Sequence, residues 1–364
     1  MAANRVTIQD IADALGVSRN TVSKAINNTG ILADATRERV LQKAVEMGYK
    51  QFSYAGYAGY TAPASEAEAA QAAAPAPGSS GEIALFTTKF LGDSHFSSTM
   101  LDKFQREMSQ LGYCMSMHRL FSDEVKNLQL PATFIREKTA GIICYEMFDH
   151  AYSQMLCELD IPILFVDTPV IGLGEPLKAD RLIMDNQTGI YAFIREMNRR
   201  RKTNIGFIGE YEHCQSFFER YMAYCNALEL LGLPRQKEFC FLHNKEGVEE
   251  PFTTDYQKYL YDGFSKLPKL PDVFICANDF VAIDALCALR AAGYRVPQDV
   301  YLCGFDDSPE SRILTPSLTT IHIHSQIMGV SAVQLLVSRI KEPQLNYRTI
   351  YTETSLIYRE STED

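Results

Sequence analysis

The sequence predicts an α/β protein: a small N-terminal all-helical domain, then a larger domain of two α/β lobes with parallel sheets. Three observations predict this. Apolar residues recur at helical spacing within residues 1–50, and residues 51–81 are dominated by Ala, Gly, Ser and Pro. From residue 82 onward, short apolar strands alternate with amphipathic helices. We therefore expect domains at 1–50 and 82–364, joined by a flexible linker at 51–81.

The first helical segment has the pattern of a helix-turn-helix. Thr7 precedes an apolar stripe and Asp10 follows three residues later, a pair typical of a capping box in which Asp replaces the usual Glu. Gly16 can form the tight turn because glycine accepts positive φ at no steric cost, and Ser18 is suited to cap a second helix. A third helix over residues 36–47 would complete one small domain.

The polar face of the second helix has the chemistry of a DNA reader. Arg19 can bind guanine through two hydrogen bonds, and Asn20 can bind adenine in the same way. The hydroxyl side chains and the helix N-terminal amides can contact phosphate. The alternative is an ordinary helical hairpin with a solvated polar face.

The charge of the chain is unevenly distributed. The formal net charge is −10, yet residues 1–60 hold seven Lys and Arg against five Asp and Glu, a net +2 that leaves −12 for the remainder. Phosphate attraction is thereby confined to the small domain. Because +2 is modest, we expect one copy to bind weakly and two copies to bind a palindromic site together.

The composition excludes other classes of protein. The nine Cys are an odd number, form no CxxC pair and lie in apolar strings, as expected for reduced thiols. No apolar run approaches the roughly 18 residues of a membrane span, and no signal peptide is evident. We expect a cytoplasmic protein with no membrane partner, no metal and no cofactor.

The larger domain contains too many strands for one compact sheet. The predicted strands are residues 82–88, 113–120, 141–147, 162–168, 204–210, 239–244, 272–279 and 300–307. Two lobes whose strand carboxyl ends face each other across a cleft accommodate them, and ligands bind at such ends.

Polar residues collect after the strands of this pattern. They are His95 and Phe96, Asp185 and Asn186, Ser216 and Arg220, Asn278 and Asp279, and Asp306 and Asp307. A ring, a guanidinium, carboxylates and amides converging on a cleft suit a small polar ligand. The alternative for each Asp–Asn or Asn–Asp pair is a helix cap or a turn.

These features resemble the lactose-repressor (LacI/GalR) family of bacterial transcription regulators. The resemblance is carried by TIQDIADALGVSRNTVSKAIN, the TRERV helix ending in MGY, MDNQTGIYAFIREMNRRRKTNIGFIG, the spaced Ser216 and Arg220, FICANDFVAIDALCALRAAGYRVPQDVYLCGFDDSPESRILTPSLTTI and the closing RES. It implies a periplasmic-binding-protein-like larger domain, a homodimer, a near-palindromic double-stranded DNA operator and a small-molecule effector, most often a saccharide.

The resemblance also implies roles for individual positions. The implied DNA-binding residues are Thr7, Ser18, Arg19, Asn20, Thr21, Ser23, Lys24 and Asn27. The implied effector-binding residues are His95, Phe96, Asp185, Ser216, Arg220, Asn278 and Asp306. The chain departs from the family in its hinge, because no leucine stands between Phe52 and Leu85 to wedge into the DNA minor groove.

The sequence leaves other functions open besides that of a repressor. One is a regulator that responds to a protein partner or to a nucleobase. Another is a sugar-processing enzyme built on the same lobes, but no glycine-rich phosphate loop, GxSxG or HExxH motif is present. His322 and His324 could be metal ligands, but without a Cys or carboxylate partner at suggestive spacing a hydrogen-bonded role is favoured.

Overall fold

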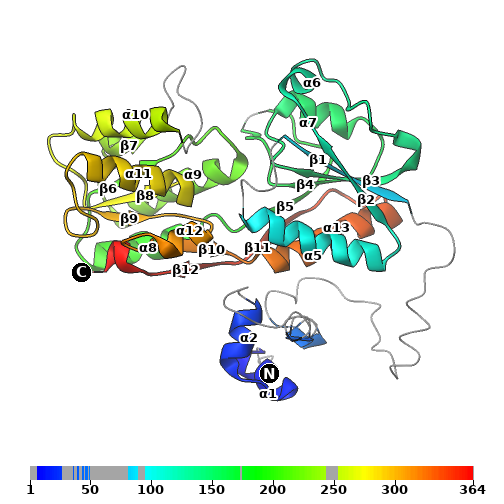
Figure 1. Cartoon of the computed structure of the whole chain (residues 1–364), viewed down its shortest axis with the longest axis horizontal. Coiled ribbons are helices and arrows are strands. Elements are labelled where there is room, and N and C mark those ends of the chain that lie inside the picture. Colours follow the sequence, from blue (N-terminus) through cyan, green and yellow to red (C-terminus); the bar gives the residue numbers. More distant parts are fainter. Residues whose placement is uncertain are drawn as a thin grey trace.

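The computed structural model describes residues 6–26, eight residues between 36 and 49, and residues 81–363 apart from 89–94, 173 and 243–252. The side chains of residues 95–97 are not described. The predicted linker, except for Gly81, and the implied DNA-binding residue Asn27 lie outside the described residues. Figure 1 shows the helical N-terminal domain, hereafter the head, below two α/β lobes that lie side by side.

The helix-turn-helix forms as predicted from its local signals. Helix α1 spans Ile8–Leu15 and α2 spans Arg19–Ile26. The Thr7 side chain accepts a hydrogen bond from the Asp10 amide, and the Asp10 carboxylate accepts one from the Thr7 amide at 2.8 Å, so the capping box is confirmed. Gly16 has φ of 64° at the end of α1, and Ser18 Oγ accepts from the Thr21 amide at 3.0 Å at the start of α2.

The core of the head includes one residue from the larger domain. Val22, Ala25 and Ile26 of α2 are buried together with Ile11, Ala12, Val40, Ala44 and Tyr49. The same cluster contains Ile327, which belongs to a helix of the first lobe and is only 2% exposed. The head therefore packs against the larger domain through Ile327.

The first lobe is a six-stranded parallel sheet in the order β11-β5-β4-β3-β1-β2. Its strands are β1 Glu82–Thr87, β2 Cys114–Arg119, β3 Thr139–Tyr145, β4 Ile163–Val166, β5 Asp180–Met184 and β11 Thr349–Thr352. Its helices are α5 His95–Gln110, α6 Ser122–Lys126, the short η2 Arg136–Lys138, α7 His150–Cys157 and α13 Ser325–Lys341. Buried side chains of α5 and α13 join one core cluster and those of α7 another, so the sheet is packed on both faces.

The second lobe is a four-stranded parallel sheet in the order β7-β6-β8-β9. Its strands are β6 Ile205–Ile208, β7 Cys240–Phe241, β8 Val273–Cys276 and β9 Tyr301–Cys303. Its helices are α8 Thr188–Arg199, α9 Gln215–Leu231, η3 Lys237–Phe239, α10 Thr254–Phe264, α11 Asp279–Ala291, α12 Pro309–Ile313 and η4 Glu360–Thr362. An antiparallel pair, β10 Thr320–Ile323 and β12 Thr354–Ile357, runs beside it.

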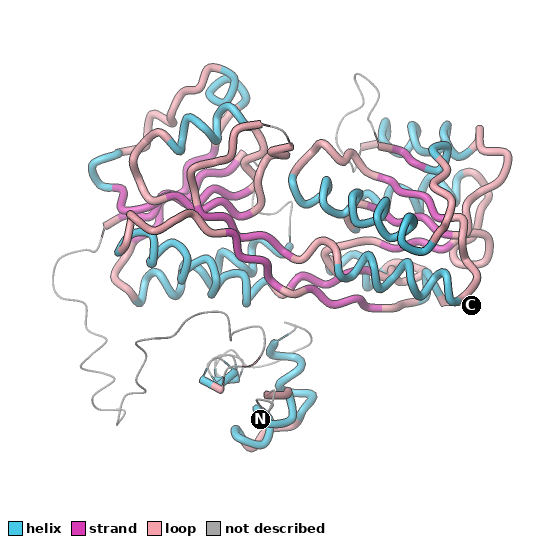
Figure 2. Tube along the Cα trace, turned by 180° about the vertical axis from the view of Figure 1, so that it is seen from behind, coloured by secondary structure: helices cyan, strands magenta, loops and turns pink. Residues whose placement is uncertain are grey.

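The chain crosses between the lobes three times, at 184–188, 323–325 and 352–354. The first lobe is thus completed by α13 and β11, which follow the four-stranded sheet of the second lobe in sequence. Figure 2 shows the strands of these crossings running between the two lobes along the side nearer the head.

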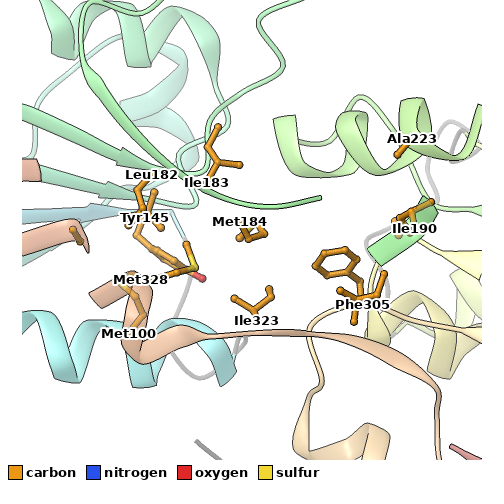
Figure 3. Packing of buried hydrophobic residues seen from close by; sticks show 14 of the residues in the cluster. Met100, Tyr145, Leu182, Ile183, Met184, Ile190, Ala223, Phe305, Ile323 and Met328 are labelled. Carbon is orange, nitrogen blue, oxygen red and sulfur yellow. The ribbon is translucent and has the colours of Figure 1, made fainter. Parts of the chain in front are cut away.

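One apolar cluster continues from lobe to lobe along the crossings. Tyr145 and Met328 belong to the first lobe and Ile190 and Ala223 to the second, and all are buried in the same cluster. In Figure 3, Met184 and Ile323, at the ends of two crossing strands, lie between those groups. The lobes therefore share a core at the hinge rather than meeting only at a surface.

The predicted two-lobed architecture with parallel sheets is confirmed, and each of the eight predicted strands overlaps a strand of the structure. Four strands were not predicted: β5, β10, β11 and β12. All four border the lobe crossings, and none is longer than five residues. None of the helices in the described part of the chain has the length and apolar character needed to span a bilayer.

Candidate functional site

A cavity of about 120 Å³ lies between the lobes at the carboxyl ends of their strands. The first lobe contributes Tyr145, Glu146, Phe148, Val166, Asp167 and Met184, and the second lobe contributes His213, Cys214, Ser216, Phe217, Arg220, Asn278, Phe280 and Asp306. We call this cavity the cleft. Its position follows from the topology, because strand carboxyl ends of both parallel sheets open toward it.

Arg220 is the central cation of the cleft and is 2% exposed. Its Nε donates to Asn186 Oδ1 at 2.9 Å, and its Nη1 donates to the Ala277 carbonyl at 2.7 Å. The guanidinium lies 3.5 Å from the ring centre of Phe305, and its Nη1 is 3.5 Å from Asp306 Oδ1. These contacts fix the plane and direction of the guanidinium before any ligand binds.

Asn186 orients Arg220 and is itself held by α9. Its Nδ2 donates to Glu219 Oε2 at 2.9 Å and lies 3.3 Å from Ser216 Oγ, which accepts from it. Ser216 in turn donates to Met184 Sδ at 3.0 Å. Since Asn186 lies on the first crossing and Glu219 on α9, the position of Arg220 depends on how that crossing sits against the second lobe.

Burial governs the ionisation of the carboxyl groups around Arg220. It raises the pKa of Asp306 to about 7 despite the opposing effect of Arg220, and the nearby carboxylates of Glu146 and Asp167 add to the rise. Burial likewise raises the pKa of Asp167. Behind the cleft, burial and the charge of Asp306 raise the pKa of Asp279 to about 8. The single positive charge of Arg220 therefore cannot neutralise all of the carboxyl groups around it.

The same three lining carboxyl residues have strained backbones. Glu146, Asp167 and Asp306 have φ of 50°, 60° and 109°, in the region that favours glycine. Such residues cost about 1–3 kcal/mol each and cluster at ligand sites, where strain holds a side chain in position. All three of these residues with strained backbones line one cavity, where their carboxyl oxygens can accept hydrogen bonds.

Aromatic rings form a wall that spans both lobes. Phe148 of the first lobe contacts His213 of the second, with ring centres 5.1 Å apart and near-perpendicular planes. His213 also lies 5.3 Å from the ring of Phe217. Ring faces beside hydrogen-bond acceptors suit a ligand that has an apolar face and polar edges.

Direct hydrogen bonds join the two lobes at the edge of the cleft. Asp167 Oδ1 accepts from the Ser216 amide at 3.2 Å, and the Thr168 carbonyl accepts from the Gln215 amide at 2.9 Å. The N-cap residue of α9, Cys214, makes no capping bond with its own side chain. The first lobe therefore satisfies free amides of a helix in the second lobe.

The structure brings four of the predicted effector residues together and leaves Asp185 outside the cleft. Ser216, Arg220, Asn278 and Asp306 all line the cleft. Asp185 does not, because its Oδ1 accepts from the Gln187 and Thr188 amides at the start of α8. The helix-cap alternative thus describes Asp185. His95 and Phe96 begin α5, but their side chains lie outside the described part of the chain.

Several cleft residues were not singled out from the sequence. They include Glu146, Phe148, Asp167, His213, Phe217 and Phe280. Glu146 and Asp167 directly follow β3 and β4, at the ends of two predicted strands, so the rule that placed Asp306 in the cleft would have found them. Phe148 and His213 lie on irregular loops, where no periodicity marks them.

His322 and His324 have hydrogen-bonded roles. His322 Nδ1 lies 2.9 Å from Asp307 Oδ2, and His324 Nε2 lies 2.9 Å from Ser355 Oγ. Although burial opposes it, hydrogen bonds from His322, Arg359 and Arg312 hold the pKa of Asp307 at about 2. Among the residues that the structure describes, no cluster of three or more potential metal ligands occurs.

Some of the residues predicted to bind DNA are exposed on the surface of the head. Arg19 and Asn20, in the first turn of α2, are exposed, as are Thr7 and Ser18. Thr21, Ser23 and Lys24 are half-buried. The hydroxyls of Ser18 and Thr21 lie 2.8 Å apart and are hydrogen-bonded to each other, and Ser18 also caps α2.

The raised pKa of Asp306 yields a test of the electrostatics of the cleft. With an unfolded pKa of 3.8 and a folded pKa of about 7, the folded protein keeps a proton that the unfolded chain has released. The contribution of Asp306 to the free energy of unfolding therefore falls as pH rises from about 4 and is lost above about 7. Asp306→Asn cannot ionise, so between pH 5 and pH 8 its stability relative to the wild type should rise by about 1–4 kcal/mol in urea denaturation.

Asp299 provides the control. Arg295 holds its pKa below the usual range, so it stays ionised throughout that window. Asp299→Asn should therefore change stability by the same amount at pH 5 and pH 8. A similarly constant difference for Asp306→Asn would show that the cleft does not raise the pKa of Asp306.

Two family models match parts of the chain. Residues 7–51 match the model for bacterial regulatory proteins of the lacI family, and residues 194–362 match that for a periplasmic binding protein-like domain. The HTH-type transcriptional repressor PurR of Mannheimia succiniciproducens is 25% identical over 98% of both chains. The probable HTH-type transcriptional repressor ExuR of Bacillus subtilis is 24% identical over 98% of both. These relatives are repressors rather than enzymes.

Solved structures show the same fold. A complex of the transcriptional regulator CelR with cellobiose matches with a TM-score of 0.67 and 23% identity, over 98% of this chain and 100% of that one. The lac repressor dimer bound to operator and the anti-inducer ONPF matches with a TM-score of 0.60 and 20% identity, over 99% and 100%. The chain therefore belongs to the lacI family of bacterial regulatory proteins and is a DNA-binding transcriptional repressor.

Proposed function

We propose that this repressor is a cytoplasmic homodimer that reads a near-palindromic operator with α2 and responds to a neutral monosaccharide bound in the cleft. The ligand proposal rests on one observation: the guanidinium of Arg220 shares the cleft with the carboxyl groups of three residues that have strained backbones, Glu146, Asp167 and Asp306. Carboxylate oxygens accept hydrogen bonds from sugar hydroxyls, and Arg220 can donate to a hydroxyl or ring oxygen.

The size and charge of the cleft narrow the class of ligand. Its volume of about 120 Å³ lies below the roughly 300–1,000 Å³ of drug-sized sites, which favours one ring over a disaccharide. An anionic ligand such as a uronate would add charge to three carboxyl groups, while Nε and Nη1 of Arg220 are already bonded to Asn186 and Ala277. The rings of Phe148 and His213 can cover the apolar face of a sugar.

A nucleobase is the second candidate. The PurR repressors among the relatives favour it, and a planar base would fit the same aromatic wall. The abundance of acceptors around Arg220 argues for a ligand with many donors, which favours the sugar.

The DNA contacts follow from the polar face of α2. Arg19 and Asn20 are proposed to read base edges, with Lys24 one turn further on. Thr7, Ser18, Thr21, Ser23 and Asn27 are proposed to contact phosphates, which fix the position of the helix in the groove. Two heads would then read the two halves of the operator.

The homodimer is proposed from an uncovered edge of the first lobe. Strand β2 is the last strand of its sheet, so one side of its backbone has no neighbouring strand among the described residues. Large apolar side chains are exposed along and beside it: Leu111 by 47%, Met117 by 58% and Phe121 by 59%. Exposed apolar edges are unfavourable in a monomer and are covered by pairing.

For DNA reading, Arg19→Ala should cost about 1–3 kcal/mol and flatten the preference at one operator base pair, because a bidentate base contact is lost. A binding array of operator variants measures both effects. Arg39→Ala, on the exposed surface of the head, removes the same charge and should weaken all sequences about equally. Unaltered base preference in Arg19→Ala would refute its assignment.

For the effector, a thermal-shift panel of neutral monosaccharides, uronates and nucleobases should stabilise the protein only with a neutral monosaccharide, by about 2.7 kcal/mol at a hundredfold excess over Kd. Arg220→Lys and Phe148→Ala should abolish the shift, whereas the exposed Arg290→Lys should retain it. Stabilisation by nucleobases alone would favour the second candidate, and stabilisation by none would reject the proposed cleft ligand.

For the dimer, Met117→Glu should raise the dissociation constant at least tenfold in sedimentation velocity, because it places a charge in the proposed contact. Ile313→Glu is the matched control, since Ile313 is 83% exposed but lies on the second lobe. A dimer unaffected by Met117→Glu would exclude this edge as the interface.

A further inference from the structure

A second cavity, of about 500 Å³, lies outside the cleft where the lobes meet. Its lining residues are Ile171, Gly172, Pro176 and Arg181 of the first lobe and Gln215 and Phe218 of the second. We call it the outer pocket. Its volume lies within the roughly 300–1,000 Å³ of small-molecule sites and exceeds that of the cleft.

The outer pocket exists because of one connection in the first lobe. Strands β4 and β5 are joined by residues 167–179, whose described part contains no helix. In a doubly wound sheet a connection of this kind usually carries a helix that covers the sheet. Here the first turn of α9, from the other lobe, forms the facing wall.

The outer pocket combines one cation with apolar walls. Arg181, on β5, is half-buried, and its guanidinium has no hydrogen-bond or ion-pair partner among the described residues. Ile171, Pro176 and Phe218 supply apolar surface around it. A guanidinium without a partner binds carboxylate or phosphate through paired hydrogen bonds, and the apolar walls can cover the rest of such a molecule. This chemistry suits a small organic anion with an apolar or ring portion.

Three hydrogen bonds connect the wall of the outer pocket to the cleft. Gln215 Nε2 donates to Glu219 Oε1 at 3.1 Å, and Asn186 Nδ2 donates to Glu219 Oε2 at 2.9 Å. Asn186 Oδ1 then accepts from Arg220 Nε at 2.9 Å. Gln215 and Arg220 thus line different cavities but share one hydrogen-bonded chain.

We propose that the outer pocket is a second ligand site, in which Arg181 binds the carboxylate or phosphate of a small organic anion. The bound anion acts through Gln215, Glu219 and Asn186 on Arg220 and changes the affinity of the cleft for its own ligand. Binding at Arg181 is independent of the function proposed for the cleft, whereas the change in cleft affinity rests on it.

Calorimetric titration of the full-length protein tests the binding. The probes are benzoate and phenyl phosphate, with inorganic phosphate and the neutral benzyl alcohol as comparisons. One or both aromatic anions should bind, and the stronger identifies the anionic group. Benzyl alcohol should bind at least tenfold more weakly. Arg181→Gln should weaken anion binding at least tenfold, Arg181→Lys should restore part of it, and the exposed Arg106→Gln should leave it unchanged.

Three results would overturn the site. Equal anion affinity in Arg181→Gln would show that Arg181 is not the contact. Loss of anion binding in Arg220→Lys, with circular dichroism showing a folded protein, would place the anion in the cleft instead. Failure of every anion to bind at 10 mM would equally reject the outer pocket as an anion site.

A second titration tests the connection to the cleft. With a monosaccharide that binds the wild type, saturating anion should change the sugar Kd severalfold, and the sugar should change the anion Kd by the same factor. Gln215→Leu should keep anion binding but remove that change. Anion binding that leaves the sugar Kd unaltered would overturn the proposed relay. If no sugar binds, the function proposed for the cleft fails while the first titration still decides the outer pocket.

Discussion

The three chain crossings between the lobes are hydrogen-bonded to one another, and the rest of the structure depends on this constraint. The Thr352 carbonyl accepts from the Asp185 amide at 2.7 Å, and Thr354 donates to the Asp185 carbonyl at 2.9 Å, so the first and third crossings move together. The second crossing leaves β10, which pairs with β12 just after the third. A change in the angle between the lobes must therefore pass through all three crossings at once.

The cleft and the contact between the head and the larger domain both lie close to the three crossings. Asn186, which orients Arg220, lies on the first crossing itself. Ile327 lies in the first turn of the helix that the second crossing enters, and it is the residue that completes the core of the head. The cleft and the head thus contact neighbouring parts of one hinge, although a long linker also separates them in sequence.

The neighbours of each buried carboxyl group distinguish the carboxylates that hold the fold together from the carboxyl group in the cleft. Arg339 and Arg348 hold the pKa of Asp180 below its usual range despite burial, and hydrogen bonds from His322, Arg359 and Arg312 do the same for Asp307. Asp306 and Asp279 have too few compensating partners, and their pKa values rise to about 7 and 8. The compensated carboxylates join strands and helices, whereas Asp306 faces a cavity, as expected of a carboxyl group in a ligand site.

Local signals predicted the parts of the structure that local interactions determine. The capping of α1 by Thr7 and the turn at Gly16 depend on neighbours within four residues, and both were predicted correctly. The short strands at the crossings could not be predicted, because their partners lie in distant segments. Asp185 and Asn186 show the limit most clearly: adjacent residues of similar chemistry face α8 and Arg220, respectively, and only the completed fold distinguishes them.

The insertion of the second lobe within the first has a consequence for synthesis. Asp180 is fully buried, yet its partner Arg348 lies 168 residues further along the chain. While the ribosome makes the intervening segment, the first sheet lacks both β11 and the guanidinium groups that compensate this carboxylate. The sheet of the second lobe, β6 to β9, is contiguous in the chain and emerges complete during that interval. The first lobe is therefore the first to be synthesised in part, but it can complete its fold only after the sheet of the second lobe has emerged.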